Sequence, residues 1–146
     1  MIEVRRDTTA TPTAVWEVLR DGWLYPSWVV GAARIRGVEP RWPAVGARIH
    51  HSVGLWPLLL DDNTEVLAAE PPHAVTLQAR GWPLGEARIE IRTLPRPNGG
   101  STIVMREDAD RGPGKLVPKP VRRVLIVPRN VETLRRLAYL AEGRSR

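Results

Sequence analysis

The sequence of 146 residues contains no cysteine. Disulfide bonds, thiol nucleophiles and cysteine-based zinc or iron–sulfur sites are therefore excluded. A long apolar run is also missing, because the most apolar stretch, Leu55 to Leu60, is far too short to cross a bilayer. The first residues alternate like a strand and lack the apolar core of a signal peptide. These absences favour a cytoplasmic protein, since a reducing compartment suits a chain without disulfides.

Phenylalanine is absent as well, whereas six tryptophans are present, and lysine occurs only at Lys115 and Lys119. The net charge of +6 is concentrated between Arg111 and Arg136, where eight basic residues accompany a single acidic one, Glu132. This basic 111–136 segment predicts either a solvated helix face or a surface for an anionic membrane or nucleic acid. Because no aromatic residue interleaves with these arginines, we expect no nucleic-acid partner.

Seven segments alternate between apolar and polar residues, and Pro or Gly stands at the breaks between them. This pattern predicts an antiparallel meander. The alternation is cleanest from Arg88 to Arg92, which indicates a strand that is covered on one face only. The predicted strands are Ile2 to Thr9, Arg34 to Val38, Arg48 to Val53, Asn63 to Ala69, Ala74 to Arg80, Ala87 to Leu94 and Ser101 to Asp108.

Helical patterns flank this series of strands. Thr11 and Pro12 form a helix start, followed by an apolar stripe to Leu19, and Trp23 to Trp28 predicts a second short helix or turn. A long helix is predicted up to about Glu142, kinked or split at Pro128, with Arg122, Arg129 and Arg136 on its polar side. Its predicted buried face consists of Val124, Val127, Val131, Leu134, Ala138 and Ala141.

Local motifs accompany this order of elements. They are Ala14-Val15-Trp16, Tyr25-Pro26-Ser27-Trp28, Glu70-Pro71-Pro72, Gly100-Ser101-Thr102 leading to Glu107, and Asn130 through Leu134, Leu137 and Glu142. On these residues the chain resembles the START-like (SRPBCC) superfamily with its Bet v 1-like helix-grip fold, and specifically the polyketide cyclase/dehydratase-related branch.

The resemblance implies an α+β fold in one domain spanning residues 1–146. A curved seven-stranded antiparallel sheet would wrap around a long C-terminal helix, with two short helices after the first strand. It also implies a small hydrophobic ligand, lipid-, polyketide- or aromatic-like, held between the sheet and that helix. Members of the superfamily include carriers as well as enzymes, so the fold alone does not decide the function.

Strand parity identifies candidate residues for the wall of this cavity. If Ile89 and Ile91 face the long helix, alternate residues of the neighbouring strands share their face. Trp28 and Trp56 are the candidates for the cavity mouth, because flat apolar rings with one N–H suit ring-shaped ligands. The predicted ligand-binding residues are Tyr25, Trp28, Ile49, His51, Val53, Trp56, Leu77, Ala79, Ile89, Ile91, Met105 and Leu134.

Two inward-facing residues are candidates for catalysis. His51 could act as a general acid or base or orient a ligand, or could simply be a hydrogen-bonded core histidine. Glu107 shares the parity of Met105 and either has a functional role or is paired with an arginine. His50 and His51 face opposite sides of a strand and cannot chelate one metal. With no metal or nucleotide motif in the sequence, we expect no metal and no cofactor.

Three hypotheses follow from these observations. The first is a binding protein for a small hydrophobic molecule. The second is a cofactor-independent cyclase or dehydratase that uses His51 as acid/base, assisted by Glu107 or Tyr25. The third is recognition of an anionic partner through the basic 111–136 segment. The sequence leaves both a monomer and a homodimer open.

Overall fold

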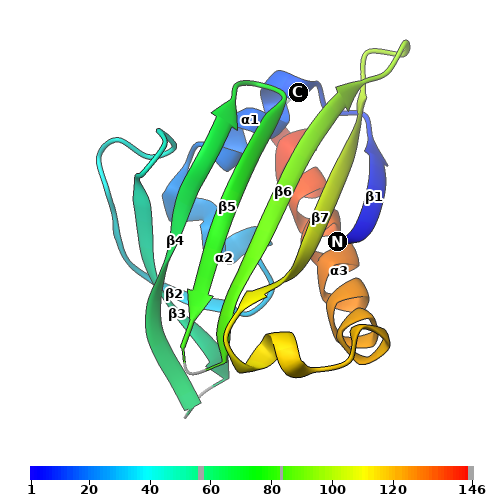
Figure 1. Ribbon diagram of the computed structural model, residues 1–146. Coiled ribbons are helices and arrows are strands. Elements are labelled where there is room, and N and C mark those ends of the chain that lie inside the picture. Colours follow the sequence, from blue (N-terminus) through cyan, green and yellow to red (C-terminus); the bar gives the residue numbers. More distant parts are fainter. Residues whose placement is uncertain (56–57, 83, 145–146) are drawn as a thin grey trace.

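A computed structural model describes residues 1–55, 58–82 and 84–144, and the side chains at 33, 53–55 and 58–59 are outside this description. Figure 1 shows a curved sheet with the long C-terminal helix across one face. The elements are β1 (Ile2–Thr8), α1 (Pro12–Leu19), η1 (Gly22–Leu24), α2 (Tyr25–Trp28), β2 (Ala32–Val38), β3 (Arg48–Leu55), β4 (Leu58–Glu70), β5 (Ala74–Gly81), β6 (Gly85–Pro95), β7 (Ser101–Arg111), η2 (Pro113–Leu116) and α3 (Lys119–Arg144).

The seven strands form one antiparallel sheet in the order β1-β7-β6-β5-β4-β3-β2. Consecutive strands from β2 to β7 are neighbours, while β1 pairs with β7 at the far edge (Figure 1). The predicted α+β architecture and its two short helices after the first strand are therefore confirmed. Strand β4 begins earlier than predicted, because Leu58 to Asp62 continue the pairing with β3.

Local chemistry explains the first helix. The Thr11 hydroxyl accepts a hydrogen bond from the Ala14 backbone N–H at 3.1 Å, and Pro12 occupies the first turn. One face of α1 is then buried, including Val15 and Val18 at 0 % exposure. The next helical segment, α2, is only four residues long, and it buries Tyr25 and Trp28 against the inside of the sheet.

The inner face of the sheet packs against α1, α2 and the second half of α3. Alternate residues of each strand face inward, as in β6, where Ile89, Ile91 and Thr93 are buried. From Asn130 onward α3 contributes Thr133, Leu134, Leu137, Ala138 and Ala141 to the same core. Within the described residues, the helices are too short or too polar to span a bilayer.

The predicted buried face of α3 is partly wrong. Val124 is 71 % exposed, because the first turns of the helix extend beyond the sheet (Figure 1, orange). Val131 is 50 % exposed although the neighbouring Asn130 is buried, so it lies beside the buried face and not in it. The helix is also continuous through Pro128 and is not split there. Arg122 and Arg129, predicted on the polar side, instead form ion pairs with Asp108 and Glu107 of β7.

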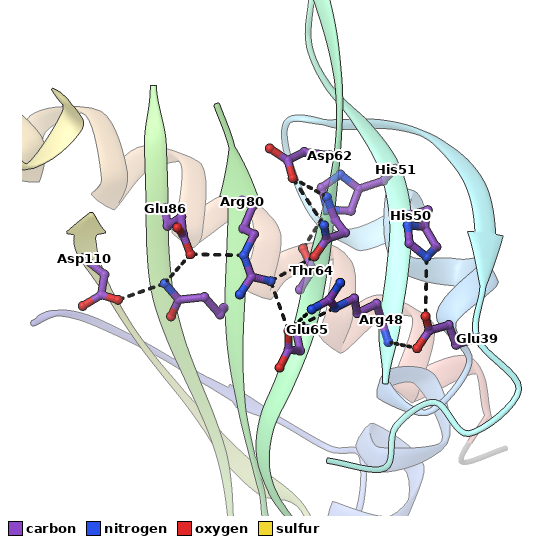
Figure 2. A network of polar contacts seen from close by, with 12 residues as sticks. Glu39, Arg48, His50, His51, Asp62, Thr64, Glu65, Arg80, Glu86 and Asp110 are labelled. Carbon is purple, nitrogen blue, oxygen red and sulfur yellow. Dashed lines mark hydrogen bonds and ion pairs between the residues drawn. The ribbon is translucent and has the colours of Figure 1, made fainter. Parts of the chain in front are cut away.

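The outer face of the sheet holds a network of charges across β3, β4, β5 and β6 (Figure 2). Arg80 forms ion pairs with Glu65 at 3.3 Å and with Glu86 at 3.2 Å, and Arg48 pairs with Glu65 at 3.0 Å. Gln78 extends this network by donating to Glu86 and Asp110. Arg88 also lies 3.9 Å from Asp110, so each of these charged groups has a partner of opposite sign and the network forms a polar outer surface.

The core position of the second half of α3 can be tested by truncating one side chain. Leu137→Ala removes a side chain with 0 % exposure and should lower the free energy of unfolding by about 2–5 kcal/mol, measured by urea denaturation. Tyr139→Ala, two residues away but 74 % exposed, is the matched control and should change it by less than about 0.5 kcal/mol. Equal effects of the two variants would contradict this packing.

Candidate ligand-binding site

Strands β3 and β4 bring two polar side chains together inside the sheet. His51 has the same parity as Ile49, and Ile49 lies opposite Thr64 in the register of β3 and β4. The His51 Nε2 atom is 2.7 Å from the Thr64 hydroxyl, and both side chains are buried. Figure 2 shows His51 facing Thr64 while His50 points to the other side of β3, toward Glu39. The predicted opposite orientation of the two histidines is therefore confirmed.

An aromatic pair from α2 completes this cluster. The Tyr25 hydroxyl is 3.3 Å from the Thr64 hydroxyl, and the Tyr25 ring stacks on His51 with centroids 5.6 Å apart and planes inclined by 13°. Trp28 meets Tyr25 edge to face with centroids 5.3 Å apart. The two residues are three positions apart on a helical turn, which places them on the same face.

Two ring nitrogens in this cluster have no hydrogen-bond partner among the described residues. They are Nε1 of Trp28 and Nδ1 of His51, and both atoms are buried. A buried polar atom without a partner costs about 1–3 kcal/mol, so such atoms call for an explanation. They are available to bond a polar atom of a bound molecule.

Burial keeps both titratable rings of the cluster uncharged. It lowers the pKa of His51 to about 4, although the carboxylate of Asp62 opposes the change. It raises the pKa of Tyr25 to about 12, although the hydrogen bond with Thr64 opposes this. At neutral pH the cluster therefore offers hydrogen bonds without a net charge.

A second polar group joins β7 to α3. Glu107 is 3 % exposed and accepts hydrogen bonds from Arg129 Nη2 and, at 3.2 Å, from Asn130 Nδ2. Both partners are needed because an unpaired buried carboxylate is strongly destabilising. The sequence left open whether Glu107 has a functional role or is paired with an arginine, and in the structure it is paired with Arg129. The negative charge of Glu107 also contributes to the raised pKa of Tyr25.

The structure brings most of the predicted ligand-binding residues into one buried cluster. Ala79 is partly buried and packs against this cluster, and His51 joins it through Tyr25. Trp56 and the side chain of Val53 lie outside the described residues. The predicted residues inside the cluster are Tyr25, Trp28, Ile49, Leu77, Ile89, Ile91, Met105 and Leu134.

Four polar residues of this region were not predicted as site residues. Thr64, Asn130 and Thr133 are at most 1 % exposed, and Arg129 is the partner of Glu107. Thr133 accepts a hydrogen bond from the backbone N–H of Val30 at 3.2 Å, which ties the end of α2 to α3. Helical periodicity in the sequence could have identified two of them as buried, because Asn130 and Thr133 share a helix face with Leu137.

Among the described residues, the side chains of the candidate site pack against one another. Tyr25, Trp28 and His51 are at most 3 % exposed and pack against the inner face of the sheet. A surface cleft of about 380 Å³ lies elsewhere, between α1, η1 and the connection from β2 to β3, beside Trp23 and Trp42. A smaller one of about 110 Å³ lies at the β4–β5 turn. A ligand must therefore displace side chains to enter the cluster.

Comparison with known proteins gives a consistent picture. A family described as polyketide cyclase / dehydrase and lipid transport matches residues 1–142. No curated protein matches the sequence. Among solved structures, protein SA2116 of unknown function from Staphylococcus aureus is 13 % identical with a TM-score of 0.73, and the match covers 98 % of this chain and 93 % of that one.

Two further solved structures share the fold. Ara h 8.0201 is 13 % identical with a TM-score of 0.70, over 99 % of this chain and 95 % of that one. The di-domain ARO/CYC StfQ from the steffimycin biosynthetic pathway is 17 % identical with a TM-score of 0.71. That match covers 98 % of this chain but 50 % of StfQ, so this chain corresponds to half of that protein.

The buried state of His51 predicts a specific pH dependence of stability. An unfolded histidine gains its proton near pH 6.5, whereas folded His51 stays neutral down to about pH 4. Between these values the unfolded chain binds more protons, so the free energy of unfolding falls as the pH falls, by about 2–3 kcal/mol in all. His51→Gln should flatten this part of the curve of unfolding free energy against pH.

His50→Gln is the matched control, because it removes a histidine from the outward side of the same strand. The measurement is urea unfolding at a series of pH values for the wild type and both variants. A His51→Gln curve parallel to the wild type between pH 6.5 and pH 4 would mean that His51 is not buried in its neutral form.

Proposed function

Because the chain belongs to the family described as polyketide cyclase / dehydrase and lipid transport, we propose that it binds a small, largely apolar molecule between the inner face of the sheet and α3. The apolar lining supports this proposal. Leu77, Ile89, Ile91 and Met105 project from three neighbouring strands toward the helix. When a ligand enters, these side chains pack against it, so that their apolar surface stays out of water. Burial of apolar surface is worth about 25 cal/mol per Å².

The proposal extends to the polarity of the ligand, and the pair of unpartnered ring nitrogens supports it best. Trp28 Nε1 is a donor only, so it fits a carbonyl or hydroxyl oxygen. His51 Nδ1 is a donor when Thr64 donates to Nε2, and an acceptor in the other tautomer. We therefore favour an apolar, uncharged molecule that has carbonyl or hydroxyl groups, a description that includes aromatic polyketides.

The carbonyl preference is tested with fluorenone and fluorene, two rigid tricyclic molecules that differ only in a carbonyl group. The wild type should bind fluorenone about two- to tenfold more tightly, since one hydrogen bond is worth about 0.5–1.5 kcal/mol. Trp28→Phe should remove most of this preference while retaining the affinity for fluorene. Affinities are measured directly by isothermal titration calorimetry with each compound.

Matched variants make the carbonyl experiment specific. Trp23→Phe alters a tryptophan that is 62 % exposed and should leave both affinities unchanged. Ala79→Trp adds bulk to the inner face and should weaken both probes, whereas Arg92→Trp adds it to the exposed side of β6 and should not. Equal affinities of the wild type for the two probes would contradict the proposed role of Trp28.

A second candidate function is cyclisation or dehydration of the bound molecule. The chain of hydrogen bonds from Tyr25 through Thr64 to His51 favours it, because such a chain can pass a proton to or from a ligand. A pKa of about 4 makes His51 a weak base at neutral pH, which is why we place binding first. StfQ, whose fold is similar, is described as an ARO/CYC protein.

The second candidate is tested with a synthetic poly-β-ketone substrate. If the protein is a cyclase, it should accelerate ring closure and loss of water, followed by mass spectrometry. His51→Gln should then slow the reaction by about a hundredfold, the usual contribution of a general acid or base. If the reaction is no faster with the wild-type protein than in buffer alone, catalysis is contradicted and binding is left as the function.

A further inference from the structure

One end of the molecule presents large apolar side chains to solvent. We define the overhang as residues 113–128, which comprise η2 and the first turns of α3, and Figure 1 shows it beyond the end of β1. Leu116 is 86 % exposed, Val124 71 %, Leu125 66 % and Val121 48 %. Monomeric soluble proteins rarely expose so many aliphatic side chains in one short segment unless a partner covers them.

The spacing of these residues places them on one side of the helix. Val121, Val124, Leu125 and Pro128 follow the i, i+3, i+4, i+7 pattern of an amphipathic stripe. At 3.6 residues per turn, this stripe points away from the side on which Asn130 and Leu137 enter the core. The apolar side of the overhang therefore faces outward.

The neighbouring turn extends the same apolar surface. Leu84 is 71 % exposed, and its carbonyl accepts a hydrogen bond from the Gly114 backbone N–H at 2.9 Å. The Trp82 ring, 47 % exposed, lies against Gly112, where a Cβ would come within 3.1 Å of the ring. Gly112 thus allows the turn and the start of the overhang to lie side by side.

Specific contacts hold the overhang in place. The Arg122 guanidinium pairs with Asp108 at 3.0 Å and donates to the carbonyls of Lys115 and Val117 at 3.0 and 2.9 Å. Arg129 pairs with Glu107 just after the overhang ends. These bonds fix the outward direction of the apolar side chains.

The charges that the overhang and its flanking residues carry in sequence are all positive. The sequence from Arg111 to Val131 contains six basic residues and no acidic one. Arg122 and Arg129 are used in ion pairs with β7, whereas none of the other four pairs with a carboxylate within the described residues. These four residues, all exposed, are Arg111, Lys115, Lys119 and Arg123.

We propose that the overhang docks the protein onto the surface of an anionic lipid bilayer. Exposed aliphatic residues flanked by lysine and arginine are the combination that enters the interface of such a membrane. A second copy of the chain fits less well, because a two-fold interface would bring two sets of like charges together. Nucleic acid also fits less well, because the outward stripe of the overhang is aliphatic and the exposed ring beside it, Trp82, belongs to the neighbouring turn and not to the basic segment.

The test uses the full chain and sedimentation with vesicles. Vesicles that contain phosphatidylglycerol should bind the protein, those of phosphatidylcholine alone should bind it at least about tenfold more weakly, and added salt should release it. Two variants separate the contributions: Leu116→Ser with Leu125→Ser removes apolar groups, and Lys115→Gln with Lys119→Gln and Arg123→Gln removes charges. Each should lower binding by about tenfold.

All five altered residues are exposed, so both variants should remain folded. Tyr139→Ser, at an exposed position of the second half of α3, is the matched control and should bind like the wild type. Absence of binding to phosphatidylglycerol vesicles, or equal binding by the variants and the wild type, would overturn the proposal. A concentration-dependent dimer that Leu116→Ser with Leu125→Ser dissociates would also overturn it and assign the overhang to a second copy. The test does not depend on which ligand the interior binds.

Discussion

The carboxylate of Glu107 is buried on the apolar side of the sheet, and its two partners both come from α3. Because Arg129 and Asn130 are consecutive, a single helical turn must lie close to β7 to satisfy this charge. That turn is where α3 changes its surroundings. After it the helix buries Leu134 and Leu137 in the core, and before it Val124 and Leu125 are exposed. The ion pair therefore lies at the boundary between the overhang and the part of α3 that packs on the candidate site.

The polar atoms of the candidate site come from elements that are far apart in the chain. Tyr25 belongs to α2, His51 to β3 and Thr64 to β4, so the cluster forms only when the strand register is correct and α2 is in place. Burial keeps both rings neutral, with pKa values of about 4 and about 12. An interior with hydrogen-bonding atoms but no charge of its own at this point suits an uncharged molecule better than an anion. The carboxylate of Glu107 does not alter this preference for an uncharged molecule, because Arg129 balances its charge.

Strand faces could be predicted from the sequence because alternation with a period of two is a local property. Leu77, Ile89 and Met105 were predicted to face inward and are buried. Helical periodicity is less informative, since it groups residues on one face without saying whether another element covers that face. The error at Val124 has this cause, because only the three-dimensional fold shows that the first half of α3 extends past the sheet. Thr64 was missed because its role depends on the β3–β4 register, which no local pattern contains.

The closed interior places a physical condition on any exchange of ligand. The sheet is held by continuous ladders of backbone hydrogen bonds, whereas α2 is four residues long and is tied to α3 by the bond from Val30 to Thr133. Moving α2 therefore breaks fewer interactions than opening the sheet, and it displaces Tyr25 and Trp28 together. A membrane bound at the overhang can influence this step only if it binds the open and closed states with different affinity. The physical connection for such a difference is α3 itself, which bears the overhang at its N-terminal end and contacts α2 near its middle, at Thr133.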